Sequence, residues 1–266
     1  MIVDTKQGGK ILKLVILRCP YDSLRIPEAQ GLFAQLMAMK IEGYRKEYPY
    51  GILPVDTTDF FGDHYLVCSK EKDGKLVPLI GAKSTFSDRC PKFRLEFPFM
   101  NYLKQNAPPE FFESAAVIFD RNKSSEKRLS YDSGYTISKE ARSNPILKNI
   151  VKELFSAIHV LFHSEIAKTD EILSMTATRF KVDRLFEFWG YHRLQSVEGG
   201  NLPEISLPSH YGQLAVCMHM RGGFSAQALE AAEKYRALWE DRIVFEADES
   251  RGESGDSGEL TAAKAA

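Results

Sequence analysis

Several features that would place this chain in a specialised class are missing. No apolar run approaches the roughly 18 residues that a membrane helix needs. The short apolar run at 11–17 is broken by Lys13 and followed by Arg18 without a small-residue cleavage site, so we predict no secretory signal. Basic residues are not in excess, with 35 Lys and Arg against 36 Asp and Glu, which argues against a nucleic-acid-binding protein. We therefore expect a cytoplasmic protein with no membrane span and no nucleic-acid partner.

Patterns typical of disulfides and metal sites are also absent. The four cysteines are scattered and form no CxxC pair: Cys19, Cys68, Cys90 and Cys217. Such cysteines are typical of reduced thiols in a cytoplasmic protein. His159 and His163 are spaced by one helical turn, but the glutamate of a zinc-protease motif is missing and the sequence shows no third ligand. We therefore predict no metal site.

The composition is that of an ordinary globular protein. Its 266 residues are 44% hydrophobic and 27% charged, which is enough chain to bury a large core. We predict a main domain at 1–222, a helix at 223–246 and a disordered tail at 247–266, because the tail is dominated by small and charged residues. No internal repeat is present, and nothing in the sequence points to a particular oligomeric state.

Apolar periodicity predicts alternating strands and helices along the main domain. In the first half we expect, in order, a strand at 11–17, a helix at 27–48, a loop at 49–62, a hairpin of strands at 64–70 and 75–86, a short helix between loops at 92–119 and a polar, mobile insertion at 120–134. In the second half we expect a strand at 135–139, a long helix at 144–165, a strand at 170–178, a short helix at 179–190, strands at 191–197 and 211–220, and a terminal helix at 224–246. This order predicts a mixed α/β layer fold around one mostly antiparallel sheet.

Four stretches of the sequence carry a resemblance to a known family. They are Lys40-x3-Tyr44-x5-Tyr50, the acid pair Asp56-x-x-Asp59 ahead of HYLV, the segment LIGAKSTF with Lys83, and TATRFKVDRLFEFWGYHRL. Together they resemble the autoinducer synthases, which make N-acyl homoserine lactones, and the related N-acyl amino acid synthases. Both groups have the GNAT acyltransferase fold. The autoinducer synthases carry arginine, phenylalanine and tryptophan at the first spacing and arginine at the place of Lys83, so this chain keeps the chemical types.

Two family motifs are incomplete in this chain. The Glu-x-Ser-Arg motif of the synthases corresponds to Thr136-Ile137-Ser138-Lys139, which lacks the glutamate. The acetyltransferase signature of Gln or Arg with two spaced glycines is also absent, because ARSNPIL contains no glycine. A loop without these glycines suits the single phosphodiester of acyl carrier protein better than the pyrophosphate of coenzyme A.

The resemblance implies transfer of an acyl group from a phosphopantetheine thioester to the amine of an amino acid or related small acceptor. The donor is acyl carrier protein or coenzyme A, used as a co-substrate, and we expect no tightly bound cofactor. The implied catalytic residues are Asp56, Asp59, Lys83 and Ser138, the donor-binding residues are Lys139, Arg142, Ser143 and Asn144, and the substrate-binding residues are Lys40, Tyr44 and Tyr50. The two carboxylates can bind an ammonium group or accept its proton, and a helix start near Asn144 can bind a phosphate.

Simpler interpretations of the same residues stay open. The two aspartates can belong to a solvated loop or cap a turn, and Lys83 can face solvent from an edge strand. Two other functions also fit the sequence. One is an N-acetyltransferase that uses acetyl coenzyme A, and the other is a GNAT-like binding module without catalysis, which the missing glutamate and glycines favour.

Overall fold

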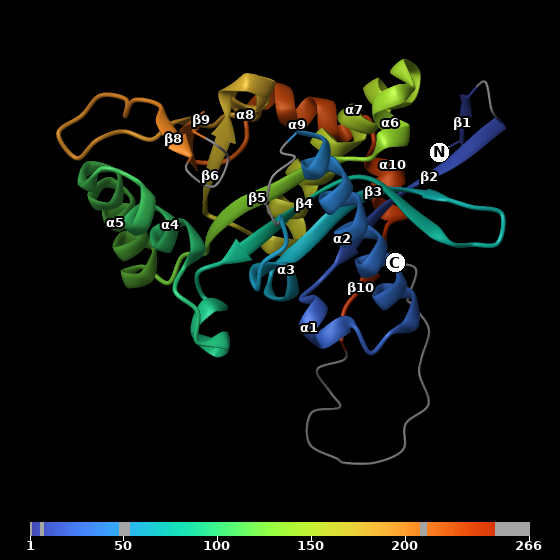
Figure 1. Cartoon of the computed structure of the whole chain (residues 1–266), viewed down its shortest axis with the longest axis horizontal. Helices are drawn as coiled ribbons and strands as arrows, with labels where there is room; N and C mark the ends of the chain where they lie inside the picture. Colours follow the sequence, from blue (N-terminus) through green and yellow to red (C-terminus); the bar gives the residue numbers. More distant parts are fainter. Residues whose placement is uncertain (1, 6–7, 48–53, 208–211, 248–266) are drawn as a thin grey trace, which may run out of the picture.

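The computed structural model of the protein describes residues 2–5, 8–47, 54–207 and 212–247. These residues form one ten-stranded sheet flanked by helices (Figure 1). The mixed α/β class with a mostly antiparallel sheet, predicted from the order of elements, is therefore confirmed. Within the described residues, no helix combines the length and apolarity needed to cross a membrane.

The strands of the sheet follow the order β1, β2, β3, β4, β5, β6, β9 and β7, with β10 beside β2 and β8 beside β9. Their bounds are β1 Ile2–Thr5, β2 Gly8–Leu17, β3 Asp63–Lys70, β4 Leu76–Phe86, β5 Leu129–Ile137, β6 Glu171–Ala177, β7 His192–Arg193, β8 Ile205–Leu207, β9 Gln213–Arg221 and β10 Ile243–Phe245. The pairs β2–β10 and β5–β6 are parallel, and the hairpin of β3 and β4 is antiparallel.

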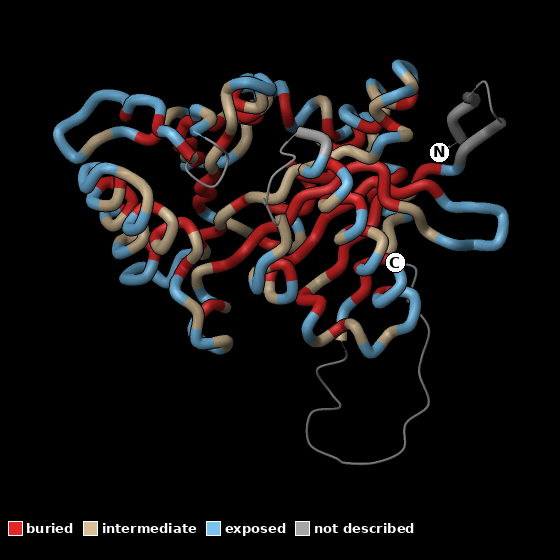
Figure 2. The backbone as a smooth tube through the Cα atoms, in the orientation of Figure 1, coloured by how far each residue is buried: buried red, intermediate tan, exposed pale blue. Residues whose placement is uncertain are grey.

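Side-chain alternation along the inner strands divides the core between the two faces of the sheet. Leu14 and Ile16 of β2 pack with the long helix α7 (Pro145–Leu161), whereas Val15 and Leu17 pack with α2 (Pro27–Glu47). The inner strands are consequently buried along most of their length (Figure 2). Two more helices, α9 (Ala226–Glu233) and α8 (Val182–Trp189), complete the α7 face.

Two helices cover the other end of the sheet, where the sequence predicted one short helix. They are α4 (Pro98–Asn106) and α5 (Pro109–Ser124), and they share an apolar cluster with β8 and β9. Each begins with a proline, whose missing N–H costs nothing at the first helical position. The prolines in this segment therefore start helices rather than confining it to loops.

The predicted mobile insertion at 120–134 is wrong, because α5 runs to Ser124 and the inner strand β5 begins at Leu129. The first part of β5 lacks an apolar alternation, since Ser130 and Asp132 are polar yet fully buried. The side-chain partners of Asp132 come from other parts of the chain, at Tyr65, His159 and His163, so a single-sequence pattern could not reveal the strand. The strand predicted at 135–139 is the second half of β5.

The C-terminal segment also differs from the single helix expected at 223–246. It contains α9, the short helix α10 (Arg236–Glu240) and the strand β10, which pairs in parallel with β2. The segment thus returns to the N-terminal part of the sheet. The predicted tail lies almost entirely outside the described residues, from 248 onward.

Most other predicted elements are present. The strand at 11–17, the helix at 27–48, the hairpin and the strand at 170–178 correspond to β2, α2, β3–β4 and β6. The long helix starts as predicted, with Asn144 as N-cap and Pro145 at its first position, and it continues into a π-helical turn, η2 (Phe162–Ala167). The loop at 49–62 contains a short helix, α3 (Thr58–Phe61).

Candidate active site

Three stretches that are distant in the sequence meet at one ion cluster on the α2 face of the sheet. The ammonium of Lys40, from α2, donates a hydrogen bond to Oδ1 of Asp59, from α3. The Nζ of Lys83, from β4, lies 3.1 Å from the same oxygen and 3.0 Å from Oδ1 of Asp56. The structure therefore brings four of the predicted site residues into direct contact.

The turn at Asp56–Asp59 is held by its own carboxylates. Oδ1 of Asp56 accepts a hydrogen bond from the amide of Thr58 at 2.8 Å, and Oδ2 of Asp59 accepts one from the amide of Asp56 at 2.9 Å. The first of these bonds is the Asx-type turn that the sequence left open, and the second runs from Asp59 back to the start of the turn. Turn formation and ion pairing thus occur in the same two residues.

The two aspartates differ sharply in their access to solvent. Asp59 is fully buried and the two lysines are nearly so, whereas the side chain of Asp56 keeps 63% of its surface exposed. A substrate can therefore reach the carboxylate of Asp56 but not that of Asp59. This difference separates two residues that the sequence treated as equivalent.

Burial and charge act in opposite directions on the ionisable groups of this cluster. Burial favours the neutral acid at Asp59, but Lys83 and Lys40 outweigh it and lower the pKa of that carboxyl to about 2. At Lys40, burial and the neighbouring Lys83 lower the pKa despite the opposing attraction of Asp59. Asp59 is consequently ionised at neutral pH and is a poor base for an ammonium proton.

His64, which was not among the residues predicted from the sequence, contacts the ion cluster from the sheet. It is the second residue of β3, after Asp63, and its Nε2 lies 2.7 Å from the backbone oxygen of Asp59. Burial lowers the pKa of His64 to about 4 against the attraction of Asp59. A neutral imidazole therefore links β3 to the backbone of α3.

A bulge in β5 lies next to the lysines. Because Lys83 pairs with Ser133 and Gly81 pairs with Thr136, two residues of β5 lie opposite Ala82 alone. One of them, Gly134, has a φ of 72°, and a Cβ added there would lie 3.5 Å from the Nζ of Lys40. Bulges re-aim a strand and are frequent beside active sites, and a glycine inside a strand pattern is the sequence signal for one.

The parallel strands β5 and β6 separate close to this bulge. Their pairing runs from Leu129 and Glu171 to Asp132 and Ser174, although β5 continues to Ile137 and β6 to Ala177. Within the described residues, the last part of β5 therefore has no strand partner on its β6 side. An extended ligand that contains amides can bond such a strand edge.

The predicted donor-binding segment lies just beyond this separation. Ser138 caps the short helix α6 (Lys139–Ser143), where its hydroxyl accepts a hydrogen bond from the amide of Ala141 at 3.1 Å. Asn144 caps α7 by accepting from two amides, those of Ile146 and Leu147, each at 3.1 Å. These two amides, which a phosphate at the start of α7 would use, are therefore already bonded to Asn144.

The predicted aromatic residues are only partly placed. Tyr44 is half-buried on α2, one turn beyond Lys40, and Tyr50 lies outside the described residues. Sequence reasoning missed Tyr131 of β5, whose pKa is raised mainly by burial and also by nearby charged groups that include Asp56 and Tyr44. Tyr131 packs its ring against Phe99 at a centroid distance of 5.3 Å. In the pairing of β4 with β5, Tyr131 lies opposite Thr85 and Ser133 lies opposite Lys83. Because side chains alternate along a strand, Tyr131 lies on the same face of β5 as Ser133, the residue paired with Lys83.

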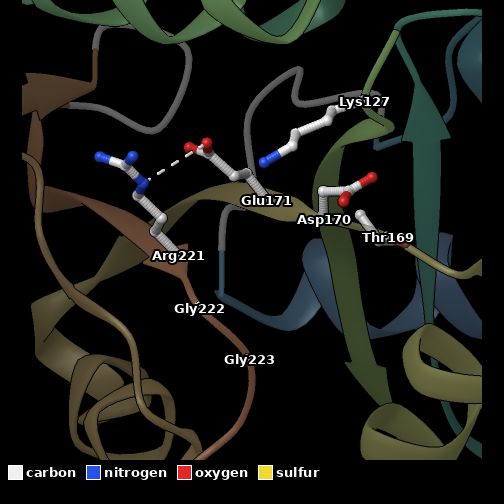
Figure 3. A pocket seen from close by; sticks show the side chains of 7 residues that line it. All are labelled: Lys127, Thr169, Asp170, Glu171, Arg221, Gly222 and Gly223. Carbon is white, nitrogen blue, oxygen red and sulfur yellow. Dashed lines mark ion pairs between the residues drawn. The ribbon is translucent and has the colours of Figure 1, made fainter. Parts of the chain in front are cut away.

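A cavity of about 350 Å³ lies at the opposite end of the β5–β6 pair (Figure 3). It is lined by Lys127, Thr169, Asp170, Glu171, Arg221, Gly222 and Gly223. Glu171 at its wall is held by Arg121 at 2.6 Å and by His219 at 2.7 Å. Ligands of parallel strands bind at the carboxyl ends of the strands, so this cavity at the start of β6 is a poorer candidate than the ion cluster.

Comparison with known proteins returned solved structures only. No protein-family model and no curated protein match the chain. TofI, solved in a ternary complex with an inhibitor and MTA, has 12% identity and a TM-score of 0.49 over 85% of this chain and 99% of its own. BjaI, a CoA-dependent acyl-homoserine lactone synthase solved with SAM and isopentyl-CoA, has 10% identity and a TM-score of 0.48 over 88% of this chain and 92% of its own. FeeM, an N-acyl amino acid synthase from uncultured soil microbes, has 10% identity and a TM-score of 0.46 over 86% and 95%.

Both groups that the sequence resembles, acyl-homoserine lactone synthases and N-acyl amino acid synthases, thus occur among the structures similar to this chain. At these identities and TM-scores the similarity transfers no residue roles. The roles assigned below rest on the side chains of this chain.

Proposed function

We propose that the protein is an N-acyltransferase that moves an acyl group from a carrier thioester to the amine of a small acceptor. One observation carries the proposal: Lys40, Asp56, Asp59 and Lys83, taken from three stretches that carry the family resemblance, form one ion cluster beside a bulged strand. In the reaction, the bound ammonium first releases one proton to solvent water. The free amine nitrogen then bonds to the thioester carbonyl carbon, the C–S bond breaks, and the second proton lost by the nitrogen neutralises the departing thiolate.

The acceptor amine binds, in this proposal, at Asp56. Its carboxylate is exposed and stays ionised, because Lys83 at 3.0 Å and the hydrogen bond from Thr58 lower its pKa despite partial burial. An ionised, accessible carboxylate held in one orientation suits an ammonium group. Two half-buried rings are candidates for contact with the rest of the acceptor: Tyr44, one turn beyond Lys40 on α2, and Tyr131, on the face of β5 that carries Ser133 opposite Lys83.

The buried members of the cluster act as positioning residues. Asp59 bonds Lys40 and Lys83, and Lys83 in turn holds Asp56 at the surface. The side chain of Lys83 is only 3% exposed. To contact an acceptor carboxylate or the acyl end of the donor, Lys83 would therefore have to leave Asp56. We therefore assign Lys83 to orientation of Asp56 first and to substrate contact second.

The donor's phosphopantetheine lies, in this proposal, along the edge of β5 that has no strand partner among the described residues. The arm contains two amides that can bond a strand edge, and the bulge places Gly134 next to Lys40 of the ion cluster. The thioester would then lie near Ser138, and the phosphate near Lys139, Arg142, Ser143 and Asn144. Because Asn144 occupies two amides of α7, the basic side chains of Lys139 and Arg142 are the stronger phosphate partners.

The experiment is direct transfer with purified full-length protein. We would supply acyl carrier protein and coenzyme A thioesters with short and long acyl chains, together with pooled amino acids and amines, and detect N-acyl products by mass spectrometry. Long-chain N-acyl products from either donor support the proposal. Acetyl products alone identify an N-acetyltransferase instead, and no product from any donor supports a binding module.

A matched pair of variants links the product to the site. Asp56 and Asp73 are both exposed. The carboxylate of each accepts a hydrogen bond from the backbone amide two residues later in the chain, Thr58 at 2.8 Å and Lys75 at 3.0 Å. Asp56→Asn should lower kcat/KM for the acceptor by about 10- to 150-fold, the value of one charge-assisted hydrogen bond, and Asp73→Asn should leave it unchanged. Equal activities of the two variants would remove Asp56 from the site.

A further inference from the structure

A second polar cluster lies on the other face of β5, behind the candidate active site. His159 of α7 and His163 of η2 both approach Oδ2 of Asp132, with His159 Nδ1 at 3.5 Å and His163 Nε2 at 3.0 Å. All three side chains are fully buried. The sequence offered two histidines without a third ligand, and the tertiary structure supplies it from a strand 27 residues earlier in the chain than His159.

The cluster has the donor set and the spacing of a metal site. The oxygen of Tyr65, from β3, lies 3.1 Å from Asp132 Oδ2 and 3.1 Å from His159 Nδ1, which adds a fourth donor atom. Four ligands at zinc-like bond lengths of about 2.0–2.2 Å in a tetrahedron are roughly 3.3–3.6 Å apart. Four of the six separations among these donor atoms, from 3.0 to 3.5 Å, differ from that range by at most a few tenths of an ångström. The ligand atoms of Asp132, His159 and His163 all lie within 4.8 Å of one another.

The outer contacts of the two histidines fit the same assignment. The nitrogen of each ring that points away from Asp132 has its own partner: His163 Nδ1 lies 3.0 Å from Oγ1 of Thr169, and His159 Nε2 lies 3.3 Å from the hydroxyl of Tyr191. Metal-bound histidines are oriented in this way by bonds to their second nitrogen. The π-helical turn that contains His163 is a further feature frequent at functional sites.

One carboxylate oxygen of the cluster, Oδ1 of Asp132, lacks a hydrogen-bond partner among the described residues. This oxygen is buried, and the ion pairs of Asp132 with described residues involve the two histidines and no lysine or arginine. A buried carboxylate oxygen without a partner is costly. A divalent cation bound at Oδ2 would neutralise the carboxylate and so lower the cost of leaving Oδ1 without a hydrogen bond.

We propose that Asp132, His159, His163 and Tyr65 bind one divalent transition-metal ion of the zinc type. The nitrogen and oxygen donors suit such an ion, and the complete burial of the set makes the site structural, because catalytic sites keep an open position. The ion would join β3, β5 and α7 directly behind the strand that separates from β6. This proposal does not depend on acyl transfer.

The test measures metal in the full-length wild-type protein. After loading with ZnCl2 and desalting, elemental analysis should find about one zinc per chain, and removal by a chelator should lower Tm by about 5–10 °C. Less than a tenth of an equivalent, with Tm unchanged by excess zinc, would overturn the proposal. His163→Gln should lose the metal, whereas His219→Gln, which alters a histidine paired with Glu171 outside the cluster, should keep it.

If His163→Gln does not fold, substitution of the metal by cobalt in the wild-type protein tests the proposed ligands. The cobalt-loaded wild type should show visible d–d absorption of a four-coordinate nitrogen and oxygen site without a thiolate charge-transfer band. A thiolate band would overturn the proposal, because it would place the metal on one of the four free cysteines. Retention of the metal by a folded His163→Gln variant would overturn it as well.

Discussion

Replacing Asp59 with asparagine tests the organisation of the ion cluster most directly. The wild-type cluster contains two nearly buried ammonium groups, Lys40 and Lys83, and one fully buried carboxylate, so its buried part carries one net positive charge. Asp59→Asn removes the carboxylate charge and keeps the shape of the side chain. The two ammonium groups then lie close together without a buried counter-charge.

The size of the effect follows from the pKa of Asp59. Its lowering from 3.8 to about 2 means that folding stabilises the charged relative to the neutral carboxyl by about 2–3 kcal/mol, compared with the unfolded chain. Removing one partner of a buried ion pair costs about 3–5 kcal/mol in other proteins. We therefore expect Asp59→Asn to lower the free energy of unfolding by about 3–5 kcal/mol, or Tm by about 2–4 °C for each kcal/mol.

The assay is urea unfolding at pH 7, with two control variants. Asp56→Asn removes a carboxylate that also contacts Lys83, but this carboxylate is 63% exposed, so its loss should cost less than about 1 kcal/mol. Lys40→Met removes one of the two buried ammonium groups and leaves Asp59 paired with Lys83. Because no uncompensated buried charge results, Lys40→Met should cost clearly less than Asp59→Asn.

Two results would refute this reasoning. Equal costs for Asp59→Asn and Asp56→Asn would mean that burial does not distinguish the two acids. A larger cost for Lys40→Met than for Asp59→Asn would mean that packing of the lysine stem, and not charge balance, holds the cluster together. Unfolding slopes that differ among the variants would show a change in the unfolded state and would require a repeat by thermal unfolding.

Three further predictions concern groups around the cluster. Burial lowers the pKa of His64 from 6.5 to about 4, so between these pH values the unfolded chain binds a proton that the folded chain does not. The free energy of unfolding should therefore fall by about 3 kcal/mol through this group as the pH is lowered from 6.5 to 4. Urea unfolding across that range should show a shallower fall for His64→Gln, and an unchanged fall would contradict the assignment. Gly134→Ala and Gly74→Ala each place a Cβ at a positive φ, of 72° and 89°, so each should lower the free energy of unfolding by about 1–2 kcal/mol. In transfer assays, only Gly134→Ala should lower the activity. Asn144→Ala should lower thermal stability by about 1 kcal/mol through loss of the α7 cap, and a stability equal to the wild type would show that the cap is dispensable.

Local patterns were sufficient for much of the fold. Period-two and period-3.6 apolar spacing identified β2, α2 and α7, and Asn144 with Pro145 marked the start of α7, because caps and prolines act on their own neighbours. The pattern failed at β5, where the buried Asp132 takes its partners from other elements. It failed again at β10, three residues that become a strand only beside β2.

The candidate site divides in the same way. The sequence identified Lys40, Asp56, Asp59 and Lys83 as candidates, since their types and order resemble a known family. The sequence could not show that Asp59 is buried between two lysines while Asp56 reaches solvent, because that difference depends on α3 packing against β3 and β4. It likewise could not join Asp132 to His159 and His163. Spacing along the chain determines which side chains share a helix face or a turn, and only the pairing of distant strands and helices decides which charges meet.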